Sequence, residues 1–287
     1  MSLASVRALI ADDFKAVDQT IRARLASDVV LINQVSEYII GSGGKRLRPM
    51  IVLLAARACG YDGAKHIEAA AIIEFIHTAT LLHDDVVDAS DLRRGRDTAN
   101  NIFGNEASVL VGDFLYSRSF QMMVTLENMR IMDVLADATN TIAEGEVLQL
   151  LNCHDPDTDE ERYLQVIRRK TARLFEAGAQ TAAILSGKPE KVQQALARYG
   201  KHLGTAFQLV DDVLDYQADT GLTGKRLGDD LAEGKPTLPL IHSLSKANDK
   251  QRELIRGAIE SGDRGELENV MRVVESTGAI PYTARLA

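Results

Sequence analysis

The stretch Leu81-Leu82-His83-Asp84-Asp85-Val86-Val87-Asp88, closely followed by Arg93-Arg94, organises the rest of this chain. Its three aspartates stand at i, i+1 and i+4, so on a helix they share one side. The approach to them, residues 67–82, is almost wholly apolar, which predicts a core helix that ends in clustered negative charge. Repulsion and desolvation at such a cluster need a cation to offset them. We expect Mg²⁺, which prefers oxygen ligands and commonly sits between one or two carboxylates and substrate phosphates.

The same pattern returns as Asp211-Asp212-Val213-Leu214-Asp215, again after an apolar approach, residues 203–210. One copy alone could equally be a solvated helix face. If aspartate is roughly one residue in twenty, two copies arise in about one chain in a thousand. The first hypothesis is therefore two facing carboxylate clusters that bracket a metal–diphosphate.

Composition narrows the class of protein. With 45% hydrophobic and 26% charged residues in 287, the chain can form a large core, and its net charge of −8 argues against nucleic-acid binding. Cys59 and Cys153 lack metal spacing and are expected to be packed thiols of a reducing compartment. Neither a signal peptide nor an integral membrane segment is expected, so we predict a soluble, cytoplasmic protein.

Helical periodicity dominates the whole chain, and alternating strand-like runs are almost absent. Because no linker or composition shift divides it, we predict one domain over residues 1–287, an all-α helical bundle around a central cavity. The expected helices cover residues 3–26, 29–41, 48–59, 64–89, 106–126, 130–152, 159–186, 189–217, 237–246, 249–261 and 264–276.

Basic and polar residues supply candidate anion ligands. In Gly43-Gly44-Lys45-Arg46-Leu47-Arg48-Pro49 the glycines let the backbone approach a ligand, and Lys45 and Arg48 can reach it, although a solvated basic loop is also common. His77 lies two turns before Asp84, and adjacent arginines can divide between two anions. Further candidates, each more often structural when taken alone, are Lys170, Thr171, Gln208, Lys225 and Lys235. Asp229, Asp230 and Glu233 are interpreted as a solvated acidic loop.

Together these residues resemble a known family. The strings GGKRLRP, EFIHTATLLHDDVVDASDLRRG, GNEASVLVGDFLYSRSFQ, AEGEVLQL, KTARLFEAG, GTAFQLVDDVLDY and GDDLAEGKPTLPL are similar to those of trans-isoprenyl (polyprenyl) diphosphate synthases, most closely the bacterial octaprenyl type. The similarity runs from about residue 36 to residue 241. It implies the isoprenoid synthase bundle, usually a homodimer, with Mg²⁺ as cofactor.

The resemblance also implies a role for each matching position. Metal binding and catalysis would fall to Asp84, Asp85, Asp88, Asp211, Asp212 and Asp215, with Lys170 as a further catalytic residue. Isopentenyl diphosphate would be bound by Lys45, Arg48, His77 and Arg94. The allylic diphosphate would be bound by Arg93, Lys170, Thr171, Gln208, Lys225 and Lys235.

Product length is expected to depend on an apolar tunnel below the first motif. Small side chains at Ala79 and Thr80 leave it open, and residues around Met123 could form its floor, although methionines are more often plain core. The resemblance thus implies a prenyltransferase that extends farnesyl diphosphate with isopentenyl diphosphate to about C40, for a quinone such as ubiquinone. The alternatives are a C15 or C20 synthase, which Ala79 argues against, and a catalytically silent subunit of a heteromeric synthase. Family members usually continue beyond the position of Leu286, so one or more C-terminal helices are expected to be missing.

Overall fold

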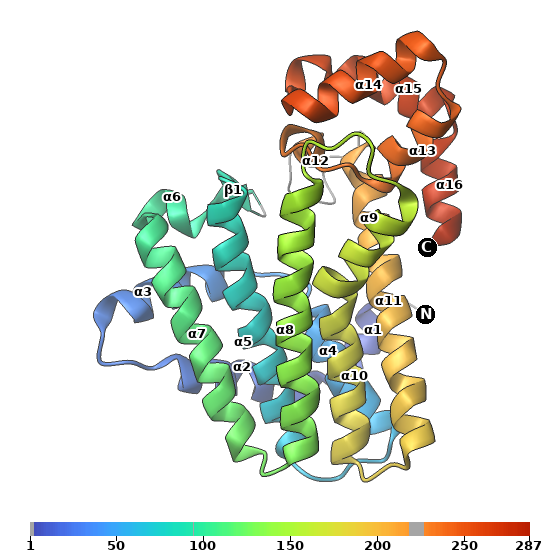
Figure 1. Ribbon diagram of the computed structural model, residues 1–287. Helices are drawn as coiled ribbons and strands as arrows, with labels where there is room; N and C mark the ends of the chain where they lie inside the picture. The colour runs from blue at the N-terminus through green and yellow to red at the C-terminus, as the bar shows by residue number, and fades with distance from the viewer. Residues whose placement is uncertain (1–2, 94, 218–226) are drawn as a thin grey trace. The chain divides into compact units, whose positions relative to one another are not determined.

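The computed structural model describes residues 3–93, 95–217 and 227–287, so the predicted site residues Arg94 and Lys225 lie outside the described residues (Figure 1). The chain divides into two compact units, which are considered separately below. The first comprises Met1–Thr139 and Leu174–Gly200, and the second comprises Asn140–Arg173 and Lys201–Ala287. Nearly all of the regular structure in the described part is helical, which confirms the predicted all-α class.

The first unit contains the helices from the N-terminal half of the chain and a short β-ribbon. These are α1 (Leu3–Ala8), α2 (Ala11–Leu25), α3 (Val30–Gly41), α4 (Leu47–Ala58), α5 (Lys65–Val87), β1 (Leu92–Arg93), β2 (Arg96–Asp97), α6 (Ala99–Phe103) and α7 (Asn105–Thr125). Most of α10 (Arg173–Leu185) belongs to it, as do the first parts of α8 (Met129–Asn152) and α11 (Glu190–Asp215).

The second unit contains the remaining parts of α8 and α11 and the C-terminal helices. Its other elements are α9 (Glu160–Ile167), a π-helical turn (Arg168–Ala172), α12 (Asp229–Ala232), α13 (Leu238–Lys246), α14 (Asp249–Ser261), a 3₁₀ turn (Arg264–Glu266), α15 (Leu267–Ser276) and α16 (Ala279–Leu286). Helices α13 to α16 pack on one another around Leu240, Ile255, Ile259 and Val270, all fully buried. No helix in the described ranges is both long and apolar enough to cross a membrane.

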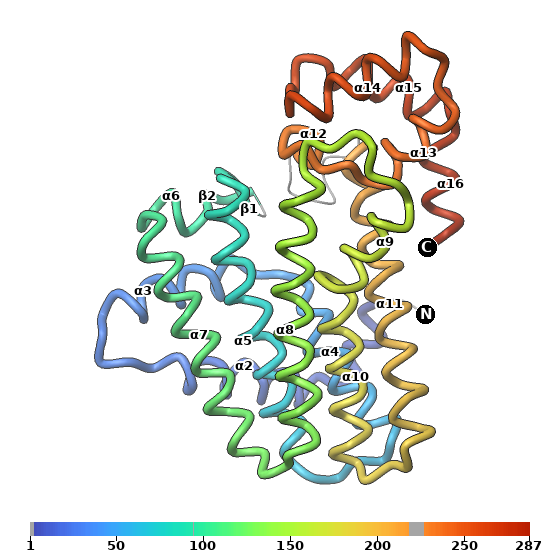
Figure 2. The backbone as a smooth tube through the Cα atoms, in the orientation of Figure 1, coloured from blue at the N-terminus to red at the C-terminus, as the bar shows by residue number. Residues whose placement is uncertain are grey.

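Helix α5 is the centre of the first unit. It packs on α2, α4 and α7, and its residues from Ala69 to Ile76 are buried on every side. Consecutive small side chains at positions 69–71 let neighbouring helices approach closely. Figure 2 shows α5 and α7 side by side, joined through the β-ribbon and α6. Gly112 of α7 lies directly against the His83 ring, where a Cβ atom would clash. This packing fixes the end of α5, which carries the first aspartate motif.

Several predicted boundaries were wrong. Residues 159–186 form two helices separated by the π-helical turn, because one extra residue in a helical turn leaves the apolar pattern almost unchanged. Residues 3–26 also break, into α1 and α2. Helices α6, α12 and α16 were not predicted; the first two are only five and four residues long.

Candidate active site

Both aspartate motifs lie at the C-terminal ends of helices. Helix α5 ends at Val87 with Asp88 as its capping residue, and α11 ends at Asp215. The C-terminus of a helix carries a partial negative charge, so carboxylates there are destabilised by the backbone as well as by one another. Each motif is therefore placed where a cation stabilises it strongly.

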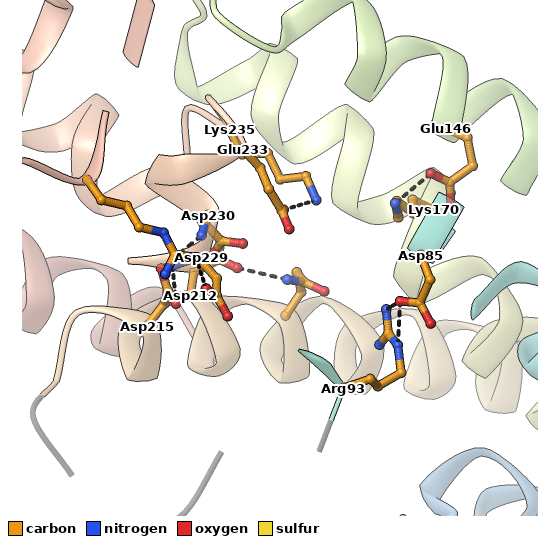
Figure 3. A network of polar contacts seen from close by, with 12 residues as sticks. Asp85, Arg93, Glu146, Lys170, Asp212, Asp215, Asp229, Asp230, Glu233 and Lys235 are labelled. Carbon is orange, nitrogen blue, oxygen red and sulfur yellow. Dashed lines mark hydrogen bonds and ion pairs between the residues drawn. The ribbon is translucent and has the colours of Figure 1, made fainter. Parts of the chain in front are cut away.

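The first motif is partly neutralised by an arginine. Asp85 is fully buried. Its Oδ1 accepts a hydrogen bond from Arg93 Nε at 2.7 Å and lies 2.5 Å from Arg93 Nη2 in the same ion pair (Figure 3). Burial raises the pKa of the Asp85 carboxyl; Arg93 opposes this shift, while repulsion from Asp84 and Asp88 adds to it. The other oxygen, Asp85 Oδ2, is buried and has no hydrogen-bond partner among the residues that the structure describes. That oxygen is suited to bind a cation.

The second motif is held by neutral donors instead. Asp212 is 1% exposed; its Oδ2 accepts a hydrogen bond from Tyr163 Oη at 2.5 Å, and its Oδ1 accepts one from Gln208 Nε2 at 2.8 Å. Burial, together with repulsion from Asp230 and Asp211, raises the pKa of Asp212 to about 8, although both hydrogen bonds lower it. Burial and the nearby Asp212 charge keep the pKa of the Tyr163 phenol well above its usual value, so Tyr163 remains a donor.

The last aspartate of this motif binds backbone N–H groups. Asp215 accepts hydrogen bonds from the backbone N–H groups of Asp229 at 3.3 Å and Asp230 at 3.2 Å, at the start of α12. Figure 3 shows these acidic residues gathered with Asp212. Asp229, Asp230 and Glu233 are half-buried, so their interpretation as a solvated loop was wrong. The reason is α12, which draws this segment onto the end of α11.

In the basic loop before α4, the two arginines contact neighbouring side chains, whereas the lysine is exposed to solvent. Arg48 Nη1 donates to His77 Nε2 at 3.0 Å, which links the loop to α5, and its guanidinium lies over the Phe175 ring at 4.7 Å from the centroid. Arg46, in a left-handed conformation with φ of 47°, lies near Glu74, with 3.6 Å between Nη1 and Oε1. Lys45 is exposed. The predicted pair Arg48 and His77 is thus brought together.

Two predicted lysines of the second unit are paired with glutamates. Lys170 Nζ lies 2.5 Å from Glu146 Oε2, and Lys235 forms an ion pair with Glu233 (Figure 3). Both lysines are largely buried, with 18% and 16% of their side chains exposed. Thr171 Oγ1 donates to Gln208 Oε1 at 2.9 Å and so joins the Asp212 network.

The π-helical turn presents Lys170 and Thr171. Gly145 of α8 lies against it: a Cβ atom there would be 2.7 Å from the Lys170 backbone nitrogen and 2.9 Å from Arg169 Cβ. Only glycine therefore allows this close approach. Single π-turns inside helices are frequent at functional sites.

The residues expected to set product length are both core residues of the first unit. Ala79 on α5 is fully buried and Met123 on α7 is 1% exposed. Ala79 stands five positions before Asp84, and Met123 lies eleven positions beyond Gly112, about 16 Å along α7.

A metal would fit these donors. Among the residues the structure describes, no group of three or more His, Cys, Asp or Glu side chains already converges on one point. Mg²⁺ does not require such a group, since it commonly takes one or two carboxylates and completes its shell with water and phosphate oxygens. The buried carboxylates at two helix C-termini match that demand.

Comparison with known proteins identifies the family. The family model for polyprenyl synthetase matches residues 29–276. The chain belongs to the polyprenyl synthetase family. As a member of it, the chain is a prenyltransferase with the isoprenyl diphosphate synthase fold, as predicted.

Several of its relatives in this family are long-chain synthases. The chain is 55% identical to octaprenyl diphosphate synthase of Escherichia coli over 288 residues, covering all of this chain and 89% of that protein. It is 50% identical to an all-trans-nonaprenyl-diphosphate synthase of Rhodobacter capsulatus, covering 98% and 87%. A crystal structure of the polyprenyl synthase from Caulobacter crescentus, complexed with calcium and isoprenyl diphosphate, superposes with a TM-score of 0.95 at 43% identity, covering 98% and 87%.

Sequence reasoning missed Tyr163 and Glu146, and it placed Glu233 in a solvated loop with no role in the site. Tyr163 and Asp212 are 49 positions apart, and a tyrosine within an apolar helical pattern resembles any core residue. A usable signal for Glu146 was its place in the AEGEVLQL string beside Gly145.

Proposed function

We propose that this polyprenyl synthetase is an all-trans-octaprenyl diphosphate synthase. It condenses isopentenyl diphosphate head-to-tail onto farnesyl diphosphate in successive rounds, to about C40. The observation that carries the catalytic assignment is the pair of buried carboxylates, Asp85 and Asp212, at helix C-termini where a divalent cation would stabilise them. The long chain is supported by the octaprenyl and nonaprenyl relatives.

Mg²⁺ is the proposed cofactor. The residues that would hold it are Asp84, Asp85, Asp88, Asp211, Asp212 and Asp215. When bound, it neutralises charge on the allylic diphosphate and makes it a better leaving group. The calcium in the Caulobacter crescentus enzyme supports a divalent ion in this family.

The chain's own cations bind the two diphosphates. Arg48, hydrogen-bonded to His77, and Lys45 are proposed to bind isopentenyl diphosphate, together with Arg94. The allylic diphosphate would be bound by Arg93, Lys170, Thr171, Gln208, Lys225 and Lys235. Since Lys170 and Lys235 are paired with glutamates, diphosphate oxygens must compete with carboxylates for them.

The reaction proceeds in three steps. The allylic C–O bond breaks and its electron pair leaves with the diphosphate, whose negative charge is stabilised by donors such as Lys170. The double bond of isopentenyl diphosphate, held in position by Arg48, attacks the allylic carbon and forms the new C–C bond. A proton is then lost to the departing diphosphate and a new double bond forms. Water must be excluded because it would capture the cation.

We further propose that the two units act as one catalytic domain, since the family model spans residues from both. A homodimer is supported in the first unit by α7, where Leu110 is 67% and Val124 64% exposed; a second copy would cover such apolar side chains. We also propose that the enzyme is cytoplasmic and that its product becomes the side chain of ubiquinone.

The length assignment is tested with Ala79→Tyr. A phenol ring at this fully buried position of α5 should block the growing chain, so the products with Mg²⁺, farnesyl diphosphate and labelled isopentenyl diphosphate should shorten. Asp84→Ala should make no product. Full-length product from Ala79→Tyr would contradict the tunnel, and activity in Asp84→Ala would contradict the metal role.

The same assay on the wild type separates the alternative functions. A C15 or C20 synthase would already make short products in the wild type, and a catalytically silent subunit would make no product.

A further inference from the structure

One hydrogen-bond chain runs through the second unit and ends on Asp212. Thr171 Oγ1 donates to Gln208 Oε1 at 2.9 Å, and Gln208 Nε2 donates to Asp212 Oδ1 at 2.8 Å. From the opposite side, Tyr163 Oη donates to Asp212 Oδ2 at 2.5 Å. Of these hydrogen-bonded residues, Tyr163 is the one to which the family resemblance assigns no role.

The Tyr163 ring is held by its surroundings. It is 5% exposed and belongs to a core cluster with Leu164, Ile167, Leu209 and Leu238. A ring fixed in this way directs its hydroxyl to one point, so the hydrogen bond to Asp212 needs no further ordering of the side chain. The phenol is therefore a preorganised donor.

The donors leave Asp212 able to bind a cation. Each carboxylate oxygen has two lone pairs, and Gln208 and Tyr163 each occupy one lone pair on a different oxygen. Two donors on two oxygens fix rotation of the carboxylate about its Cβ–Cγ bond. The remaining lone pairs then have fixed directions.

We infer that Tyr163 is a positioning residue that fixes the Asp212 carboxylate in its metal-binding orientation without touching substrate. This inference rests on the proposed function, because it assumes that Asp212 binds the metal. Partners that orient metal ligands in this way typically contribute tenfold to a hundredfold to metal affinity.

The test compares two Tyr→Phe variants of the full chain. Tyr163→Phe removes one hydroxyl and keeps the ring in the core. Tyr282→Phe is the matched control, since Tyr282 Oη also donates to a carboxylate, Glu160 Oε2 at 2.8 Å, in the same unit. Binding of Mn²⁺ in the presence of inorganic diphosphate is measured by electron paramagnetic resonance, and the Tm of each metal-free protein is measured as a check on folding.

Tyr163→Phe should weaken Mn²⁺ binding at least tenfold and raise KM for farnesyl diphosphate, and its KM for isopentenyl diphosphate should stay as in the wild type. Tyr282→Phe should match the wild type in Mn²⁺ affinity and in both KM values. Equal Mn²⁺ affinity in Tyr163→Phe and wild type would overturn the inference alone. Equally weakened Mn²⁺ binding in Tyr163→Phe and Tyr282→Phe would also overturn it, since a general loss of stability would then explain both results. Failure of the wild type to bind Mn²⁺ with diphosphate would overturn the proposed function, and this inference with it.

Discussion

The two aspartate motifs have the same sequence pattern and different surroundings. Asp85 forms a hydrogen-bonded ion pair with the Arg93 guanidinium, so its charge is largely compensated without metal. Asp212 accepts hydrogen bonds from the neutral groups of Tyr163 and Gln208, and its pKa rises to about 8. The pattern therefore determines where carboxylates gather, while their partners determine how strongly each motif depends on a bound cation.

The largest effect is expected for a substitution of Asp212, which should remove activity and yet stabilise the metal-free protein. Asp212→Asn should abolish turnover, because a metal ligand is lost, and should stabilise the metal-free protein by about 1–3 kcal/mol at pH 8. The neutral amide avoids a buried charge, and the Tyr163 hydroxyl can accept a hydrogen bond as well as donate one. Turnover assays and urea unfolding without metal measure the two quantities.

Asp85→Asn is the comparison variant. It should also abolish turnover, but it should destabilise the metal-free protein by about 3 kcal/mol, since the largely buried Arg93 loses its counter-charge. Stability changes of the same sign in the two variants would contradict the contrast between the motifs.

A smaller effect is expected from pH. The folded-state pKa of Asp212 is raised from 3.8 to about 8, so the folded protein binds more protons than the unfolded chain between those values. Stability of the metal-free protein should therefore fall as pH rises through this window, by up to about 1.4 kcal/mol per pH unit from this group. Unfolding free energies at several pH values, for wild type and Asp212→Asn, measure the difference. The same pH slope in both proteins would argue against an elevated Asp212 pKa.

The smallest expected effect on catalysis concerns the support of the second motif. Gly145→Ala should displace the π-helical turn, destabilise the protein by about 1–3 kcal/mol and raise KM for the allylic substrate through Lys170 and Thr171. Gly257→Ala on α14 is the matched control, because a Cβ there meets no atom within 4 Å; it should be neutral or slightly stabilising. Thermal unfolding and KM values compare the two. If Gly145→Ala behaves like Gly257→Ala, the turn does not depend on the close approach of α8.

Much of the fold follows from sequence because its signals are local. Apolar periodicity located α5, α7 and α11 to within a few residues, and the aspartates mark the ends of α5 and α11. The π-helical turn escaped prediction because one added residue scarcely changes a 3.6-residue period over a long helix.

The site divides in the same way. The charged residues of the candidate site stand out in the sequence, since aspartate and arginine clusters are unusual in apolar surroundings. Their partners do not: Tyr163 meets Asp212 only after α9 and α11 pack together, and no local pattern records that contact.

The most direct test of the account is the product of the wild-type chain. Purified protein is incubated with Mg²⁺, farnesyl diphosphate and labelled isopentenyl diphosphate, with and without excess chelator, and the products are sized by chromatography. We predict a ladder that ends near C40 and disappears with the chelator. Products that stop at C15 or C20 would contradict the long-chain assignment, and product formation undiminished by the chelator would contradict the role given to both aspartate motifs.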